Sequence, residues 1–82
     1  MDMRKLVGAN ASRIRRQRGL TQELLAERCG LSQQYLSGLE RGLRNPTIVT
    51  VYELALALGV SHLDLLAVTS EDDDMSRATT AK

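Results

Sequence analysis

The chain has 82 residues, of which 43% are hydrophobic and 26% are charged, a balance typical of one small globular domain. A single cysteine, Cys29, and a single histidine, His62, exclude an internal disulfide framework and a four-ligand zinc site within one chain. The formal net charge of +1 is unevenly divided, because residues 1–46 carry nine Lys or Arg against four Asp or Glu, whereas residues 47–82 carry two against six. The basic part is interpreted either as a surface for a polyanion or as a solvated charged face.

The length of the chain and its hydropathy pattern indicate where the protein is located and whether it gains from a second subunit. No stretch approaches the roughly 20 apolar residues of a membrane span, and residues 1–6 lack the apolar run of a signal peptide. We therefore expect a cytoplasmic protein that makes no membrane contact. A chain of this length buries a limited share of its surface and gains stability from a partner subunit.

Five short helices are predicted, in an all-α fold. The first covers residues 3–18, where apolar residues recur on one helical face before Gly19. Each later helix begins at a hydroxyl residue that caps free amides, and most end at a glycine. The predicted starts are Thr21, Ser32, Thr47 and Ser61, and the predicted ends are Gly30, Gly42 and Gly59. No segment alternates apolar and polar residues for long enough to predict a strand.

Leucines at helical intervals predict one compact aliphatic core, since Phe and Trp are absent. Beyond Val68 the chain is polar, lacks apolar periodicity and contains an acidic run at residues 71–74. We therefore predict a domain over residues 1–68 and a flexible acidic tail over residues 69–82. The expected core residues include Leu24, Leu25, Leu31, Leu36, Leu39, Leu54, Leu58, Val60, Leu65 and Leu66.

Residues 20–46 predict a helix-turn-helix. Gly30 suits the left-handed backbone of a sharp turn, and the small Ala26 permits close approach of the two helices. The second helix opens with Gln33 and Gln34, whose amides donate and accept at once, as a bidentate contact to adenine in the major groove requires. Solvent-facing glutamines without a role are the alternative interpretation.

A series of motifs runs in order along residues 4–67. They are Gly8, Ile14-Arg15, Gly19-Leu20-Thr21-Gln22, Leu25-Ala26, Gly30-Leu31-Ser32, Tyr35-Leu36-Ser37, Glu40-Arg41-Gly42, Arg44-Asn45-Pro46, and Leu54-Ala55 with Gly59-Val60-Ser61. With these motifs the chain resembles the lambda-repressor-like, Xre/Cro-type helix-turn-helix family. The resemblance implies a five-helix fold that binds double-stranded DNA, and a function as a sequence-specific transcriptional regulator such as a repressor. It implies no cofactor.

The resemblance also assigns residues to the DNA interface. It implies that Gln22 contacts a phosphate and braces the first glutamine of the recognition helix. Where Gly38 stands, many members carry a longer polar side chain, so one base contact is expected to be missing. The implied base contacts are Gln33, Gln34 and Ser37, and the implied backbone contacts are Gln22, Tyr35, Arg41, Arg44 and Asn45.

Two further features come from the resemblance. Arg15 and Glu40 are implied to form a structural salt bridge, although phosphate contact remains an alternative for Arg15. Members usually bind pseudo-palindromic operators as homodimers through the last helix. For that interface we expect Leu63 and Val68, whose simple exposure is the alternative.

No catalytic, cofactor or metal site is expected. His62 has no catalytic partner at a useful spacing, and the run at residues 71–74 lacks the glycine and spaced oxygens of a calcium loop. Cys29 is interpreted as core packing, with a redox sensor as the alternative. A different class of function is the alternative interpretation. In it, the chain is an antitoxin or protein-interaction module whose acidic tail binds a basic partner.

Overall fold

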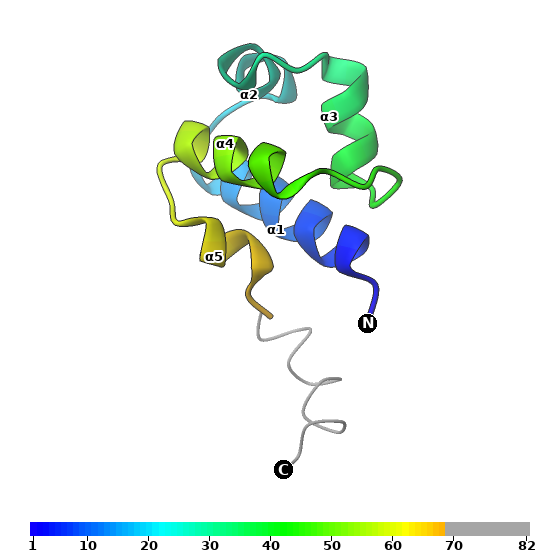
Figure 1. Ribbon diagram of the computed structural model, residues 1–82. Helices are drawn as coiled ribbons and strands as arrows, with labels where there is room; N and C mark the ends of the chain where they lie inside the picture. Colours follow the sequence, from blue (N-terminus) through cyan, green and yellow to red (C-terminus); the bar gives the residue numbers. More distant parts are fainter. Residues whose placement is uncertain (69–82) are drawn as a thin grey trace.

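The computed structural model describes residues 1–68, and residues 69–82 lie outside the described part (Figure 1). The described residues form five α-helices and no strand, which confirms the predicted fold class. The predicted boundary at residue 68 and the expected tail remain predictions. The helices are α1 (Met3–Gln17), α2 (Gln22–Cys29), α3 (Gln33–Glu40), α4 (Ile48–Leu58) and α5 (His62–Leu66).

Each helix begins at a side-chain cap. The hydroxyls of Thr21, Ser32, Thr47 and Ser61 accept backbone N–H groups of the first turns, as predicted. At α5 the cap is reciprocal, since the Asp64 carboxylate accepts the Ser61 N–H at 3.1 Å. The first cap, Asp2, was not predicted; its carboxylate accepts the Arg4 N–H at 3.0 Å. These caps explain why five helices start where they do in so short a chain.

The other helices are arranged around α1 (Figure 1). The first helix contacts α3, α4 and α5, and α2 contacts α3 and α4. In Figure 1, α2 and α3 lie at the top, α4 and α1 cross the middle, and α5 lies below them. The α2–α3 pair therefore sits at the opposite end of the molecule from α5.

The core is aliphatic, as expected, but two leucines assigned to it were placed wrongly. Leu25 and Leu65 are fully buried, whereas Leu24 is 37% and Leu66 is 39% exposed. Adjacent residues of a helix point about 100° apart, so in each Leu-Leu pair only one member faces the core. The buried cluster comprises Val7, Ala11, Ile14, Leu25, Ala26, Leu36, Leu39, Val51, Leu54, Ala55, Leu58 and Leu65.

The backbones of α1 and α3 touch directly at Gly8. A Cβ atom at this position would collide with the carbonyl oxygen of Leu39. Glycine at residue 8 therefore lets the end of α3 rest on α1, which fixes the tilt of α3 relative to the rest of the domain. Among residues 1–68, no helix is both long and apolar enough to cross a membrane.

Candidate nucleic-acid interface

The connection between α2 and α3 is a sharp turn. Gly30 ends α2 in the left-handed region, with φ of 71°, and the Leu31 N–H donates to the Ala26 carbonyl at 2.9 Å. This is the hydrogen bond of a glycine-terminated helix, and it turns the chain within two residues. Ala26 is 2% exposed, and its small side chain lets α2 pack closely within the core. The structure thus contains the predicted helix-turn-helix.

The third helix presents polar residues on one side and leucines on the other. Gln33 and Gln34 are exposed in its first turn, and Ser37 is half-buried one turn later. Leu36 and Leu39 are buried on the opposite side and hold the helix on the core. The exposed first turn also carries the partial positive charge of a helix N-terminus, which favours approach of an anion.

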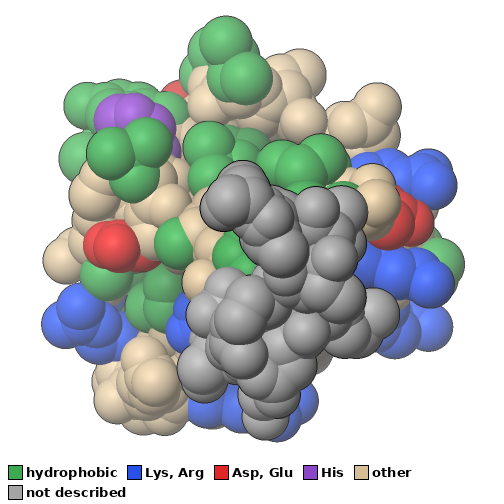
Figure 2. Space-filling model, turned by 90° about the horizontal axis from the view of Figure 1, so that it is seen from below, with side chains coloured by type: hydrophobic (Ala, Val, Ile, Leu, Met, Phe, Trp, Pro, Cys, Tyr) green, Lys and Arg blue, Asp and Glu red, His purple; other side chains and the backbone are tan. Residues whose placement is uncertain are grey.

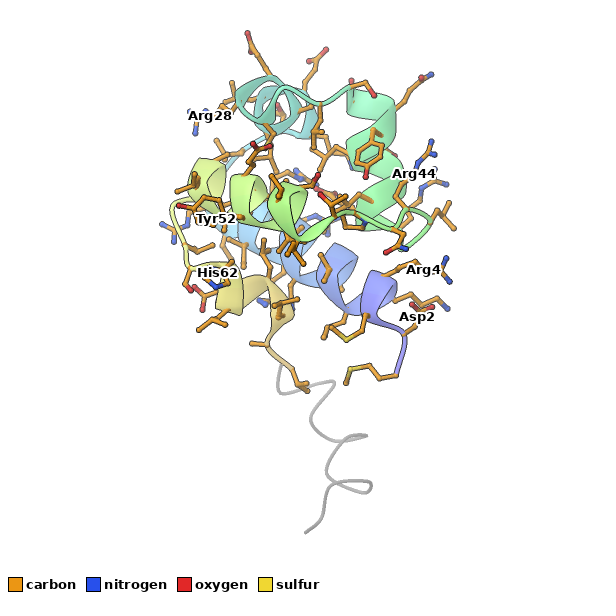
Figure 3. All side chains as sticks on the ribbon, in the orientation of Figure 1. Asp2, Arg4, Arg28, Arg44, Tyr52 and His62 are labelled. Atoms are coloured by element: carbon orange, nitrogen blue, oxygen red, sulfur yellow. The ribbon has the colours of Figure 1, made fainter. Side chains whose placement is uncertain are left out.

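The Arg44 side chain lies along α3 over Gly38. A Cβ at residue 38 would be 3.1 Å from Arg44 Nε, and the guanidinium carbon stands 5.4 Å from the centroid of the Tyr35 ring. The loop is held there because the Leu43 N–H donates to the Gly38 carbonyl at 2.9 Å. This stacking was not predicted from the sequence. Figure 3 shows Arg44 extending outward from the side of the molecule that carries α3.

The other expected backbone contacts line the same side. Arg41 and Asn45 are exposed, and Arg41 Nε donates to the Ser37 carbonyl at 3.4 Å. Asn45 borders a shallow hollow that is also lined by Asp2 and Arg4 at the start of α1. Arg4 and Arg44 lie on the same side in Figure 3. The N-terminal end of α1 therefore adds a cation beside the loop.

Arg15 and Glu40 form a bidentate ion pair, at 2.7 Å from Nε to Oε2 and 3.1 Å from Nη2 to Oε1. Their side chains are 10% and 4% exposed, so water screens the pair weakly. Arg15 also donates to the Leu20 carbonyl at 2.8 Å. The amide Nε2 of Gln22 donates to Oε1 of Glu40 at 2.9 Å, a contact that the sequence did not indicate. One carboxylate thus joins α1, α2 and α3.

A second polar group is buried in the middle of α1. Asn10 is fully buried; its Nδ2 donates to the carbonyls of Leu65 and Ala67, each at 2.8 Å, and its Oδ1 accepts from Arg13 at 2.8 Å. Its position between Val7 and Ile14 on the apolar face of α1 was a signal in the sequence that sequence reasoning missed.

The residues expected at a subunit interface are exposed. Leu63 is 63% and Val68 is 39% exposed. Near them, the rings of Tyr52 on α4 and His62 on α5 lie 6.1 Å apart, with both side chains on the side away from Arg44 in Figure 3. From below, hydrophobic side chains gather around the centre and upper left of the molecule, whereas Lys and Arg lie toward its edges (Figure 2).

Cys29 packs partly buried against the core at the end of α2. Burial raises the pKa of its thiol, and the nearby Glu53 carboxylate raises it further. A neutral thiol is a weak nucleophile, so this setting suits packing. Within residues 1–68, no group of three acidic, His or Cys side chains is placed to hold a metal ion.

Comparison with known proteins gives consistent matches. A helix-turn-helix family model matches residues 12–65. An uncharacterized HTH-type transcriptional regulator from Sinorhizobium fredii is 66% identical, over 87% of this chain and 92% of the relative. A hypothetical transcription factor from Neisseria has a similar structure, with a TM-score of 0.81 at 34% identity over 90% of this chain and 85% of that one. So does the restriction-modification controller protein C.AhdI from Aeromonas hydrophila, with a TM-score of 0.73 at 37% identity over 76% and 90%.

Proposed function

Because the chain belongs to the helix-turn-helix family of transcriptional regulators, of the lambda-repressor-like type, we propose that it binds operator DNA with α3 in the major groove. The observation that carries this proposal is the exposure of Gln33 and Gln34 in the first turn of a helix whose other side is anchored in the core. A helix held in this way enters the groove with its N-terminal residues against the base edges.

Roles within the interface follow from position. Gln33 and Gln34 are exposed and Ser37 is half-buried one turn later, and all three are proposed to read base edges. The start of α2, Tyr35 on α3 and the loop after α3 flank this surface and are proposed to hold the sugar-phosphate backbone, which sets the register. These proposed backbone contacts are Gln22, Tyr35, Arg41, Arg44 and Asn45.

The Gln22 amide is able to form a hydrogen bond to DNA while it keeps its hydrogen bond to Glu40. An amide nitrogen carries two hydrogens, and the hydrogen bond to Oε1 of Glu40 uses one of them. The second hydrogen is free to donate to a phosphate, and the amide oxygen is free to accept from Gln33. We propose that the ion pair of Arg15 and Glu40 orients Gln22 for these two tasks.

The test compares Gln33→Ala with Arg44→Ala in binding to a selected operator and to random duplex. Loss of a base contact by Gln33→Ala should cost about 1–3 kcal/mol on the operator and relax one base position. Loss of a backbone contact by Arg44→Ala should weaken both duplexes by the same factor. Gln17→Ala, which changes an exposed, uncharged residue at the end of α1 outside the proposed contacts, is the control and should leave binding unchanged. Equal wild-type affinity for operator and random duplex would contradict the proposal.

We further propose a homodimer on a pseudo-palindromic operator. Leu63 and Val68 supply exposed apolar surface on and after α5, at the end of the molecule opposite α2. A protein that binds DNA in this way acts in the cytoplasm at the nucleoid. Dimerisation doubles the number of bases read by so small a domain.

The antitoxin alternative is not favoured by the comparisons, which give transcriptional regulators and a controller protein. The protein partner expected for the acidic tail falls on residues 69–82, outside the described residues. That partner stays a proposal, and recovery of a stoichiometric basic protein with the chain from its host would support it.

A further inference from the structure

An open groove of about 490 Å³ lies between the C-terminal half of α1 and the segment from α4 to the end of α5. It is lined by apolar and charged side chains together. The lining residues are Arg13, Ile14, Gln17, Arg18, Val60, Asp64, Ala67 and Val68. We call this the α1/α5 groove. In Figure 1, α5 lies at the opposite end of the molecule from α2 and α3, and none of the residues proposed to contact DNA lines the groove.

The two arginines of the groove are able to bind a further anionic group. Arg13 gives one hydrogen bond to Asn10, which leaves four of the five N–H groups of its guanidinium. Arg18 is exposed, and no carboxylate of residues 1–68 pairs with it. The one acidic lining residue, Asp64, accepts the Ser61 N–H as part of the α5 cap. The groove thus offers two arginines and one carboxylate, a balance of one positive charge (2 − 1), beside apolar side chains.

The covalent chain carries an acidic segment directly to this place. Val68, the last described residue, lines the groove, and Glu71 follows three residues later, with Asp72, Asp73 and Asp74 after it. An extended chain covers about 3.3–3.6 Å per residue, so the link from Val68 spans at most about 11 Å to Glu71 and about 22 Å to Asp74. Such a short tether gives an effective concentration on the order of millimolar.

We propose that residues 71–74 dock in the α1/α5 groove of their own chain and pair with Arg13 and Arg18. The argument rests on the complementary charge and on the length of chain between the groove and the acidic run. Docking there holds four carboxylates away from the recognition surface, where they would repel the phosphates of DNA. It also makes Arg13 and Arg18 unavailable for non-specific binding to polyanions.

The test uses backbone amide and arginine Nε chemical shifts of the full chain. In one variant Glu71→Gln, Asp72→Asn, Asp73→Asn and Asp74→Asn are combined, and in the control Thr79→Ala is combined with Thr80→Ala. Neutralising the acidic run should shift the signals of Arg13, Arg18, Val60 and Ala67, and the control should not. The differences should be independent of protein concentration and should fade toward about 1 M salt, where the Debye length is about 3 Å.

A reciprocal pair of variants tests the same contact from the other side. Arg18→Gln should shift the amides of residues 71–74, whereas Arg16→Gln should not, because residues two apart on a helix point to opposite sides. Three results would overturn the proposal: shifts no larger than in the control, shifts centred on Arg41 and Arg44, or shifts that disappear on dilution. The last would indicate a tail from another copy. None of these results depends on whether the chain binds DNA.

Discussion

Gly38, in the middle of α3, has no side chain, and this leaves space for Arg44 against the helix. Glycine within a helix costs about 1 kcal/mol relative to alanine, yet Gly38 is buried beneath Arg44. A Cβ would lie 3.1 Å from Nε and 3.3 Å from Cγ of that arginine, which is flexible enough to move aside. Gly38 therefore has two distinct effects: it lowers the stability of α3, and it leaves the space in which Arg44 lies.

Gly38→Ala should raise stability and weaken DNA binding in the same protein. The gain in helix propensity amounts to about 1 kcal/mol at most, and denaturation by urea measures it. The displaced Arg44 should lose its stacking on Tyr35, so affinity for operator and for random duplex should fall together. Ser37→Ala, at the neighbouring position of α3, should weaken operator binding alone. A Gly38→Ala protein that binds DNA like the wild type would contradict the role given to Arg44.

The residues at which helices begin and end could be predicted from the sequence. Which side of a helix faces the core was harder to predict. The caps at Thr21 and Ser32 and the turn at Gly30 follow from local chemistry, which is legible in sequence. Long-range polar contacts such as the bond from Asn10 to Leu65 depend on how helices meet, which local patterns do not specify. The candidate site shows the same division, because its glutamines were visible in the sequence and the stacking of Arg44 was not.

Asn10 should hold α5 in place. A five-residue helix is too short to be stable alone, and α5 ends without a glycine, so the Asn10 amide bonds its last carbonyls. Asn10→Leu should leave those carbonyls unpaired and cost about 1–3 kcal/mol. Hydrogen exchange of the Leu65 and Leu66 amides should accelerate more than that of Leu36. Uniform acceleration in all helices would show that Asn10 stabilises the whole core and not α5 in particular.

For the whole molecule, the proposed dimer sets how binding responds to salt. If each protomer neutralises about four phosphates, the log-log salt slope of a dimer is near −7, at about 0.9 per phosphate, and that of a monomer is about half as steep. Leu63→Asp places a charge on exposed apolar surface at α5 and should yield monomers in sedimentation, with the shallower slope. Leu24→Asp makes the same change on α2, where the side chain is 37% exposed, and should keep the dimer. If Leu63→Asp sediments as a dimer with the full slope, the interface lies on a different face, and the apolar side chains around Tyr52 and His62 become the next surface to test.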